Sequence, residues 1–386
     1  PAEDMVPREP ATIIHNANPD PSEDVQTVTI SAETTLTEKM EVRSLIGKTG
    51  PSSASPPFTV KIVEQPLRST YPDTGLADQT ISATRKLDYL KEPTTNKYHP
   101  ILGWKPKEGV YNFPPYTKNG NYTKFTILKD GNRYSGKSTT NVKGDIIFIG
   151  GSFGQGWAVN DEETFSYLFQ KKLSNFKVKN YSVNGYGSFQ SLLMLEEILK
   201  KNRNVKLVIY CYIWHHQTRD YGNASWIQGL TNSKTFSHIA LPYARLDKNG
   251  NLIGYKPVRY FKLPLREYSV LITKIEKKIM RAKLFSINID EKKITQKIVH
   301  EIKLLAEKNG SKFAFVNLYP SSESMRISGK SHLISYNEFT KKNKIKLIDC
   351  GYELTEEYQV KGDGHPNNKA HILYADCIYN GVENLL

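Results

Sequence analysis

Short apolar runs alternate with helix-length amphipathic segments from residue 145 onward. The apolar runs are rich in Val and Ile and predict β-strands at 146–149, 178–183, 205–213, 313–318 and 345–348. Helical patterns lie between them at 162–172, 189–201, 294–308 and 336–342, and a last helix is predicted from Asn368. Buried strands separated by helices are typical of a parallel sheet with crossover connections. We therefore predict an α/β domain around a central parallel sheet of about five strands.

Two regions lack this rhythm. Residues 1–95 hold 11 of the 20 prolines between Ser/Thr-rich stretches, which indicates an extended arm. Alternating apolar and polar positions at 25–30 and 58–63 favour a small β module instead, and both interpretations stay open. Residues 220–290 are rich in aromatic side chains and interrupt the alternation. We predict a division into 1–95 and 96–386, with 220–290 as an insertion beside the active site.

Charge is unevenly distributed along the chain. Residues 1–95 carry 9 Lys and Arg against 14 Asp and Glu, whereas residues 96–386 carry 44 against 25. A positive field of this kind attracts nucleic acid, anionic polysaccharide or an acidic membrane surface. Many of these lysines lie in helix-like runs at 274–283 and 292–303, where a solvated helix face is the simpler explanation. The sequence contains no nucleic-acid recognition module, so we predict no nucleic-acid partner; contact with an anionic glycan or a membrane surface stays open.

Hydropathy and cysteine content exclude further classes of protein. The mean hydropathy is −0.51, and the longest strongly apolar run, 207–214, is far shorter than the roughly 20 residues that span a bilayer. The three cysteines, Cys211, Cys350 and Cys377, are an odd number without CxxC spacing. We predict neither a membrane-spanning helix, nor a disulfide framework, nor a zinc site, and we interpret the cysteines as buried small hydrophobes.

A serine follows the first predicted strand of the sheet. The strand runs into Gly150, Gly151 and Ser152, and a helical pattern begins a few residues later. A serine among glycines at a strand-to-helix turn has an exposed hydroxyl and backbone N–H groups free to bind an oxyanion. The alternative is a glycine-rich turn whose serine only caps a helix. We predict Ser152 as a nucleophile.

An acid and a base stand near the end of the sequence. Asp363 and His365 precede the last predicted helix and are separated by one glycine. A carboxylate this close can orient an imidazole toward a serine hydroxyl, whereas the alternative is a surface histidine without such a role. We predict Asp363 and His365 as the pair that activates Ser152.

Taken together, these motifs resemble the SGNH/GDSL hydrolase superfamily, in particular its bacterial esterases and O-acyltransferases. The likeness covers about residues 96–386, and it lies in the blocks 150–152, 180–187 and 363–367 with a lead-in at 99–104. The resemblance implies a flavodoxin-like three-layer sandwich and a serine esterase without cofactor, acting on ester groups, O-acetyl above all, of a carbohydrate or other small ester. It also implies export, because bacterial proteins of this layout are often periplasmic, cell-surface or secreted.

Three positions depart from the family pattern. Gly151 stands where the family has Asp, Ser182 aligns with a glycine whose N–H binds the oxyanion, and His215 replaces an Asn donor. We predict an oxyanion hole from the N–H groups of Ser152 and Ser182 with His215 as a further donor. Predicted substrate contacts are Gly185, Gly187, His216 and Arg219. These departures favour the alternative of a noncatalytic structural or binding protein of the cell envelope.

Two further patterns suggest ligands that we do not predict. His215 and His216 are adjacent, but side chains at neighbouring positions of an extended segment point to opposite faces, so no metal site is predicted. Residues 131–138 match the phosphate-binding loop pattern letter for letter. That loop requires a following helix, and 139–144 shows no helical pattern, so we interpret the match as chance and predict no nucleotide.

Overall fold

The computed structural model describes residues 95–116, 120–138, 141–232, 240–259, 261–266, 268–284, 290–318, 336–352 and 354–386, together with the paired strands β1 (Thr12–Ile13) and β2 (Ile62–Val63). The chain divides into two compact units, one of Pro1–Asp73 with Phe261–Lys283 and one of Thr74–Tyr260 with Leu284–Leu386. Most of the predicted arm, including the strand predicted at 25–30, lies outside the described residues. The predicted insertion, 220–290, contributes to both units.

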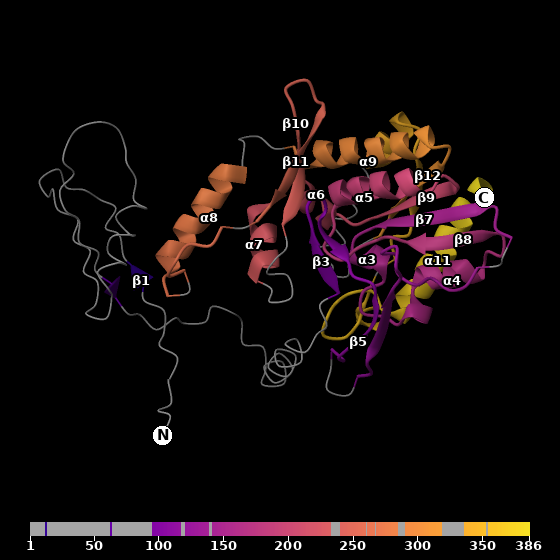
Figure 1. Cartoon of the computed structure of the whole chain (residues 1–386), viewed down its shortest axis with the longest axis horizontal. Helices are drawn as coiled ribbons and strands as arrows, with labels where there is room; N and C mark the ends of the chain where they lie inside the picture. The colour runs from indigo at the N-terminus through magenta and orange to yellow at the C-terminus, as the bar shows by residue number, and fades with distance from the viewer. Residues whose placement is uncertain are drawn as a thin grey trace, which may run out of the picture. The chain divides into compact units, whose positions relative to one another are not determined.

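A five-stranded parallel sheet forms the centre of the larger unit (Figure 1). Its strands are β7 (Gly144–Gly150), β8 (Phe176–Asn180), β9 (Val205–Tyr212), β12 (Lys312–Asn317) and β13 (Lys346–Asp349). The spatial order β8-β7-β9-β12-β13 is the 2-1-3-4-5 order of flavodoxin-like folds. The predicted fold class is therefore confirmed.

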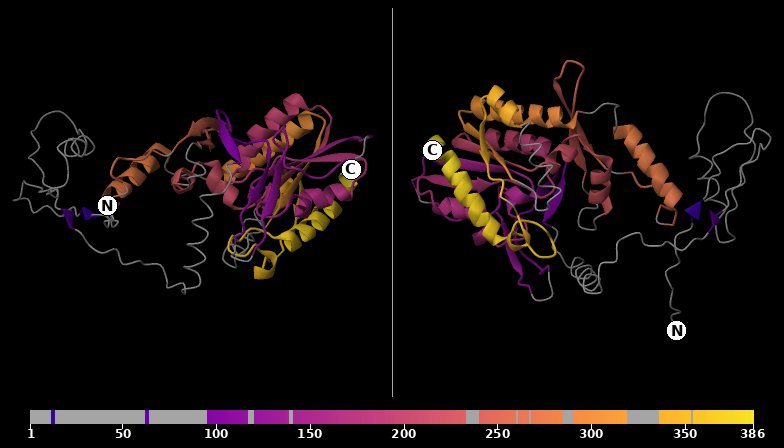
Figure 2. Two further views of the ribbon diagram at one scale, coloured as in Figure 1. Left: turned by 60° about the horizontal axis from the view of Figure 1, so that its bottom comes forward. Right: turned by 180° about the vertical axis from the view of Figure 1, so that it is seen from behind.

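Helices cover both faces of this sheet, which gives three layers (Figures 1 and 2). One face carries α5 (Ser188–Lys201), α6 (His215–Asp220) and α9 (Glu291–Lys308), and the other carries α4 (Phe165–Lys171) and α11 (Asn368–Val382). Alternate side chains of the strands pack toward opposite faces. Phe148 and Ile209, for example, join α4 and α11 in one core cluster. Residues 336–342 are helical, as predicted.

Antiparallel hairpins and short elements complete the larger unit. The hairpins pair β3 (Asn96–His99) with β4 (Gly103–Pro106), β5 (Gly109–Phe113) with β6 (Thr123–Ile127), and β10 (Leu241–Leu246) with β11 (Leu252–Val258). The remaining helices of this unit are α3 (Ser152–Gln155), α7 (Ala224–Asn232) and the 3-10 turns η1 (Asp161–Glu163), η3 (Glu356–Tyr358) and η4 (Glu383–Leu385). Helix α8 (Val270–Leu284) falls almost entirely in the other unit.

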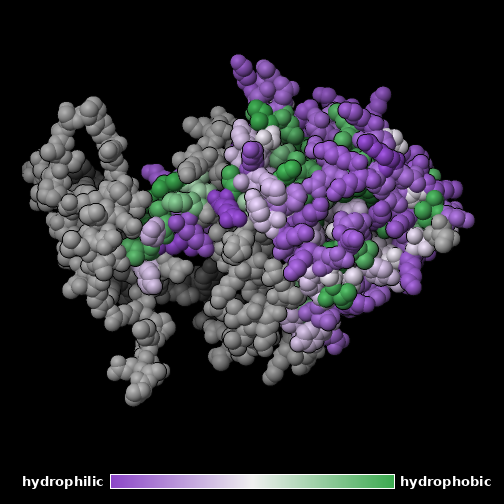
Figure 3. Space-filling model, in the orientation of Figure 1, coloured by the Kyte–Doolittle hydropathy of each residue, from purple (hydrophilic) through white to green (hydrophobic). Residues whose placement is uncertain are grey.

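The basic surface of α9 shows how the lysine-rich runs are accommodated. Ile294, Ile298 and Ile302 are buried, while Lys297 pairs with Glu301 on the outer side. Hydrophilic side chains cover most of the described surface on the face shown in Figure 3. Among the described residues, no helix has the length and apolarity needed to cross a membrane.

A disulfide bond corrects the prediction for the cysteines. Cys350, directly after β13, is bonded to Cys377 in α11, 27 residues further along the chain. The prediction was wrong because cysteine spacing carries no signal for a bond between the last strand and the helix that packs beside it. Cys211 is a free, buried cysteine in β9, as predicted.

Candidate active site

Ser152 stands at the carboxyl edge of the sheet, where β7 turns into α3. Gly150 has φ 154°, and a Cβ there would lie 2.5 Å from the Cys211 carbonyl oxygen, so the neighbouring strand leaves room only for glycine. Ser152 is the first residue of α3, and its side chain is largely buried. The first N–H groups of a helix have no acceptor inside the helix, so the Ser152 N–H is available as a donor.

The structure brings the three predicted catalytic side chains into one line. Ser152 Oγ lies 2.9 Å from His365 Nε2, and His365 Nδ1 lies 2.5 Å from Asp363 Oδ2. The Asp363 side chain is 7% exposed and that of His365 is 25% exposed. Because the carboxylate can only accept at neutral pH, Nδ1 carries the proton and Nε2 is left to accept from the serine hydroxyl.

The loop from Tyr358 to Asn367 brings the Asp363 carboxylate next to the His365 imidazole. Val360 N donates to His365 O at 2.7 Å, and the N–H groups of Asp363 and Gly364 both donate to Val360 O at 3.0 Å. Gly364 has φ +84°, a left-handed conformation that glycine adopts without strain. The single intervening glycine therefore turns the chain so that Asp363 and His365 meet.

Asn367 fastens this loop to the helix that follows. Its Oδ1 accepts from Lys369 N and Ala370 N at the start of α11, and its Nδ2 donates to Glu357 O at 2.7 Å. The Phe153 ring packs against the His365 imidazole, with ring centroids 5.5 Å apart. The base is thus held by its own loop and by the residue after the nucleophile.

The oxyanion donors differ from those predicted. The Ser182 N–H donates to Asn180 Oδ1 at 3.0 Å, so this amide, predicted as a free donor, is already engaged. Strand β8 ends at Asn180, three residues before the predicted end, although Tyr181 N and Val183 N still donate to the backbone of β7. Gly185, predicted as a substrate contact, has φ +78° in a turn closed by Tyr186 N and Val183 O, and its N–H has no acceptor within the described residues. Gly185 is therefore the better candidate for the second amide donor.

His215 opens α6 and lies close enough to His365 to interact with it electrostatically. Burial, together with the charges of Arg219 and His365, lowers the pKa of His215 to about 4, so the ring is neutral near pH 7. The ring stacks on Trp214 with centroids 4.1 Å apart. His215 and His216 belong to a helix, not to the extended segment assumed from the sequence. No group of three or more His, Cys, Asp or Glu residues suited to a metal ion occurs within the described residues.

Three of the predicted substrate contacts have supporting positions instead. A Cβ on Gly151 would lie 2.6 Å from His216 Nε2 and 3.2 Å from Arg219 Nη1, so these two side chains fill the space that the family's Asp would need. His216 is fully buried, and its Nδ1 lies 2.7 Å from Tyr210 OH. Burial keeps the pKa of His216 well below its usual value, with Arg219 and His215 adding to the effect.

Gly187 has a similar structural reason. A Cβ there would lie 2.5 Å from Asp220 Oδ1, which accepts from Phe189 N at the start of α5. Burial raises the pKa of Asp220 to about 6, against hydrogen bonds from Thr295 and the α5 amides that lower it. Gly187 therefore makes room for a carboxylate that caps α5 and does not itself point to a substrate.

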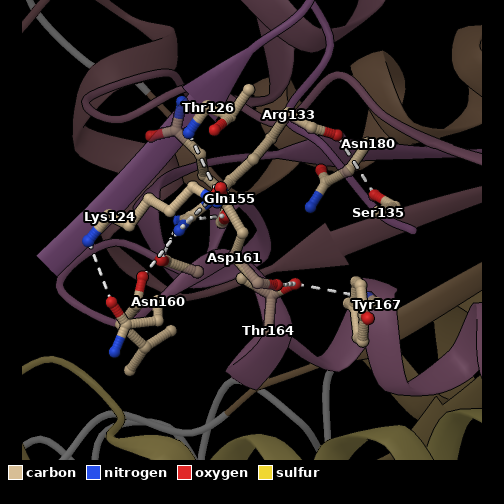
Figure 4. Close-up of polar contacts among 12 residues, drawn as sticks. Lys124, Thr126, Arg133, Ser135, Gln155, Asn160, Asp161, Thr164, Tyr167 and Asn180 are labelled. Carbon is tan, nitrogen blue, oxygen red and sulfur yellow. Dashed lines mark hydrogen bonds and ion pairs between the residues drawn. The ribbon is translucent and has the colours of Figure 1, made fainter. Parts of the chain in front are cut away.

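Arg133 is a buried residue behind the nucleophile turn whose role the sequence analysis missed (Figure 4). It is fully buried; Nη1 donates to the carbonyl oxygens of Gln155, at 3.1 Å, and Gly156, and Nη2 donates to Val159 O at 2.6 Å. Asp161 Oδ1 lies 3.5 Å from the guanidinium. Burial lowers the pKa of Arg133 to about 10, opposed by Asp161.

Within residues 131–138, Arg133 has a structural role that the phosphate-loop pattern does not indicate. No helix occurs in 131–138 or 141–143. Arg133 instead donates hydrogen bonds to carbonyl oxygens at the end of α3 and in the loop behind Ser152. Asn180 Nδ2 adds a bond to Gly154 O at 2.9 Å, and Gln155 Oε1 accepts from Asn184 N at 3.0 Å. The nucleophile turn is thus fixed from three neighbouring segments.

Comparisons with known proteins give structural likeness alone. No protein-family model matches the sequence, and no curated protein matches it. The esterase EstA from Pseudoalteromonas sp. is 13% identical, with 62% of this chain and 97% of that chain covered and a TM-score of 0.37. A lipolytic protein of the G-D-S-L family from Veillonella parvula is 12% identical, with coverage of 61% and 96% and a TM-score of 0.35.

A family two carbohydrate esterase from Clostridium thermocellum, solved with cellohexaose, is 10% identical. The match covers 64% of this chain and 65% of that chain, with a TM-score of 0.37. Because the identities and TM-scores are this low, the likeness decides neither the substrate nor the chemistry of this chain. The strand order of the central sheet establishes the fold independently of these comparisons.

Proposed function

We propose that this chain is a serine esterase that cleaves acyl esters through an acyl-enzyme on Ser152. The single observation that carries the proposal is the continuous hydrogen-bonded line from Ser152 Oγ through His365 to Asp363, with distances of 2.9 and 2.5 Å. The resemblance of the three sequence blocks to the SGNH/GDSL superfamily supports the same chemistry.

The geometry supports a two-step reaction. Ser152 Oγ attacks the ester carbonyl carbon while His365 Nε2 takes the hydroxyl proton, and the Asp363 carboxylate stabilises the imidazolium that forms. The alcohol then leaves with the proton from His365, and the acyl group remains on Ser152. Water, deprotonated by His365, attacks the acyl-enzyme and releases the carboxylic acid, which restores the serine hydroxyl.

The oxyanion that forms in each step needs donors near Ser152. The N–H group of Ser152 has no acceptor within α3, and that of Gly185 has no acceptor among the described residues. We assign these two groups as the backbone donors. His215, neutral near pH 7, is the side chain that we assign as third donor. In this assignment Gly185 takes the role that was predicted for Ser182.

The substrate class and the compartment are part of the proposal. We assign O-acetyl groups of a carbohydrate, or another small ester, as the substrate, and a sugar hydroxyl in place of water would make the same acyl-enzyme an O-acyltransferase. The Cys350–Cys377 bond supports a periplasmic, cell-surface or secreted location, because disulfides persist in oxidising compartments. Fractionation of producing cells tests the location.

A noncatalytic binding protein of the cell envelope is the second candidate. The observation in its favour is the engaged Ser182 amide together with the glycine at 151, since both remove features of the family's active site. The hydrogen-bonded line at Ser152 opposes it, because a binding protein has no use for a base aligned on a serine hydroxyl.

Hydrolysis of p-nitrophenyl acetate by the protein and by a Ser152→Ala variant separates the two candidates. We expect hydrolysis that is lost in the variant, and labelling of Ser152 by a fluorophosphonate probe. Circular dichroism of both proteins confirms that they are folded. Equal background rates together with an unlabelled serine would reject the esterase and favour the binding protein.

A further inference from the structure

A pocket of about 570 Å³ lies apart from the serine site in the same unit. Ser152, Asp363 and His365 do not line it. Its walls come from the hairpin β3–β4, the loop after β6, the end of β8 and the C-terminal part of α5. Five lysines, one histidine and three carboxylates line it, so its chemistry is that of charged groups.

Part of this charge is neutralised within the wall. Lys105 Nζ lies 2.7 Å from Glu197 Oε2, and His99 Nε2 lies 3.3 Å from the other oxygen of the same carboxylate. Lys179 pairs with Asp145, which lies outside the pocket lining, at 2.7 Å. The pairs with Glu197 hold the β3–β4 hairpin on α5, and the Lys179–Asp145 pair joins β8 to β7. The charges in these pairs are already balanced and need no ligand.

Three lysines remain without an ion-pair partner in the part of the chain that the structure describes. Lys97 comes from β3, Lys129 from the loop after β6 and Lys201 from the last turn of α5, and all three are exposed. The charges of Lys97 and Lys201 act on a common place: burial lowers the pKa of His99, Glu197 opposes this, and Lys105, Lys97 and Lys201 lower it further. Lys129 lines the same pocket. Like charges brought together from separate segments repel one another, and an anion relieves that repulsion.

Acceptors for hydroxyl groups stand beside these lysines. Glu108 and Asp130 are both exposed carboxylates of the lining; Asp130 accepts from Tyr181 OH at 2.9 Å through Oδ2 and from Asn132 Nδ2 through Oδ1. A small inorganic anion offers few or no hydroxyl donors to these carboxylates, whereas a sugar acid presents a carboxylate to the lysines and several hydroxyl donors to the carboxylates. Single-stranded nucleic acid needs aromatic stacking platforms, and the one aromatic lining residue, Tyr181, is largely buried.

We propose that this pocket binds a segment of an acidic polysaccharide, with sugar carboxylates held by Lys97, Lys129 and Lys201. This binding site goes beyond the proposed function and does not require it. The idea that the bound polymer also carries the esters that Ser152 cleaves does rest on the proposed function. Lys129 and Asp130 lie just before Arg133, and Tyr181 directly precedes Ser182. A polymer in the pocket therefore lies on the segments that fix the nucleophile turn.

Calorimetric titration of the Ser152→Ala protein with tetragalacturonate tests the site without any chemistry. We expect saturable binding that the uncharged methyl ester of the same tetrasaccharide does not show. A Lys97→Gln/Lys129→Gln/Lys201→Gln variant should bind about tenfold or more weakly, with a smaller salt dependence. A matched control, Lys308→Gln/Lys341→Gln/Lys346→Gln, removes the same charge from exposed lysines elsewhere and should bind like the parent.

Several outcomes would overturn the site. Equal weakening in the control variant would mean that overall charge alone attracts the polymer. Binding of inorganic phosphate, or of phosphatidylglycerol vesicles, that is lost in the pocket variant while tetragalacturonate does not bind would replace the glycan by another anion. The titration does not depend on catalysis, because it uses the Ser152→Ala protein. If the parent protein has no esterase activity but tetragalacturonate still binds at these lysines, the proposed function is rejected and the pocket is supported.

Discussion

The turn that carries Ser152 and the loop that carries Asp363 and His365 meet at 2.9 Å, yet they are held in opposite ways. The nucleophile turn is surrounded by buried polar groups, with Arg133, Asn180 and Asp161 all fully shielded from solvent. The acid–base loop is held by its own backbone hydrogen bonds, by Asn367 and by the disulfide that closes the segment containing it.

This difference separates two requirements of the site. A nucleophile needs a fixed position relative to the oxyanion donors, and buried, hydrogen-bonded polar groups provide it because a displacement breaks their hydrogen bonds away from water. A base must exchange protons, so His365 keeps a quarter of its side chain exposed. We therefore expect loss of the buried groups behind the turn to act mainly on stability, and loss of the acid in the loop to act mainly on activity.

Asp363→Asn gives the largest expected effect and acts at the loop. The amide cannot stabilise the imidazolium and favours the wrong tautomer of His365, so kcat should fall by about 10⁴ with little change in the unfolding midpoint. Steady-state hydrolysis and urea unfolding measure the two quantities. A variant that loses stability in proportion to activity would contradict the division between turn and loop.

Arg133→Met tests the turn. It leaves Asp161 buried without its counter-charge and three carbonyl oxygens without a donor, so the free energy of unfolding should fall by about 3–5 kcal/mol. Arg133→Met/Asp161→Asn should recover part of that loss, because the uncompensated charge is gone. Urea unfolding of the three proteins is the measurement, and an unchanged midpoint for Arg133→Met would show that the turn does not depend on this network.

Cys350→Ala/Cys377→Ala tests how the loop is fastened. Opening a 27-residue loop should lower the free energy of unfolding by about 3 kcal/mol. The backbone hydrogen bonds within the loop remain, so kcat measured well below the melting temperature should stay within about twofold. A loss of activity as large as that of Asp363→Asn would instead assign the orientation of His365 to the disulfide.

Gly151→Asp introduces at the turn the residue that the SGNH/GDSL pattern has there. The new side chain would meet His216 and Arg219, and overpacking of this kind costs about 1–3 kcal/mol. Adding His216→Ala removes one of the obstructing side chains and should recover part of the stability. Melting temperatures of the single and double variants measure the effect; full stability of Gly151→Asp would show that the two side chains can move aside.

At neutral pH the smallest expected effect comes from a buried histidine, and it grows as the pH falls. Burial, with Arg133 and His365 adding to it, lowers the pKa of His371 to about 3, whereas the unfolded chain takes up that proton near pH 6.5. Stability is therefore complete above pH 6.5 and is lost as the pH falls toward 3, by about 1.4 kcal/mol per pH unit. Asp220 acts in the opposite direction because its pKa is raised to about 6.

His371→Asn isolates this contribution. Asparagine keeps an acceptor for Phe165 N, which donates to His371 Nδ1 at 3.2 Å, but it does not titrate. Urea midpoints of the two proteins between pH 4 and 8 should diverge in slope only below about pH 6.5. Parallel curves would show that the folded protein protonates His371 without penalty.

The sequence by itself determined the five strands of the central sheet, most of the helices that cover it and the three catalytic candidates, but not the antiparallel hairpins. Apolar runs such as 146–149 are local and periodic, so they report the parallel sheet directly, and Ser152 and His365 lie in short motifs whose residues act together.

Only the tertiary structure decided the role of residues whose partners are distant in sequence. Ser182 lost its expected role because its amide is taken by the nearby Asn180 side chain, a choice of turn geometry that the motif does not encode. Arg133 and the Cys350–Cys377 bond gained theirs because folding brings them to α3 and α11. Periodicity records which face a residue presents, whereas hydrogen bonds and packing between distant segments depend on how the elements are stacked.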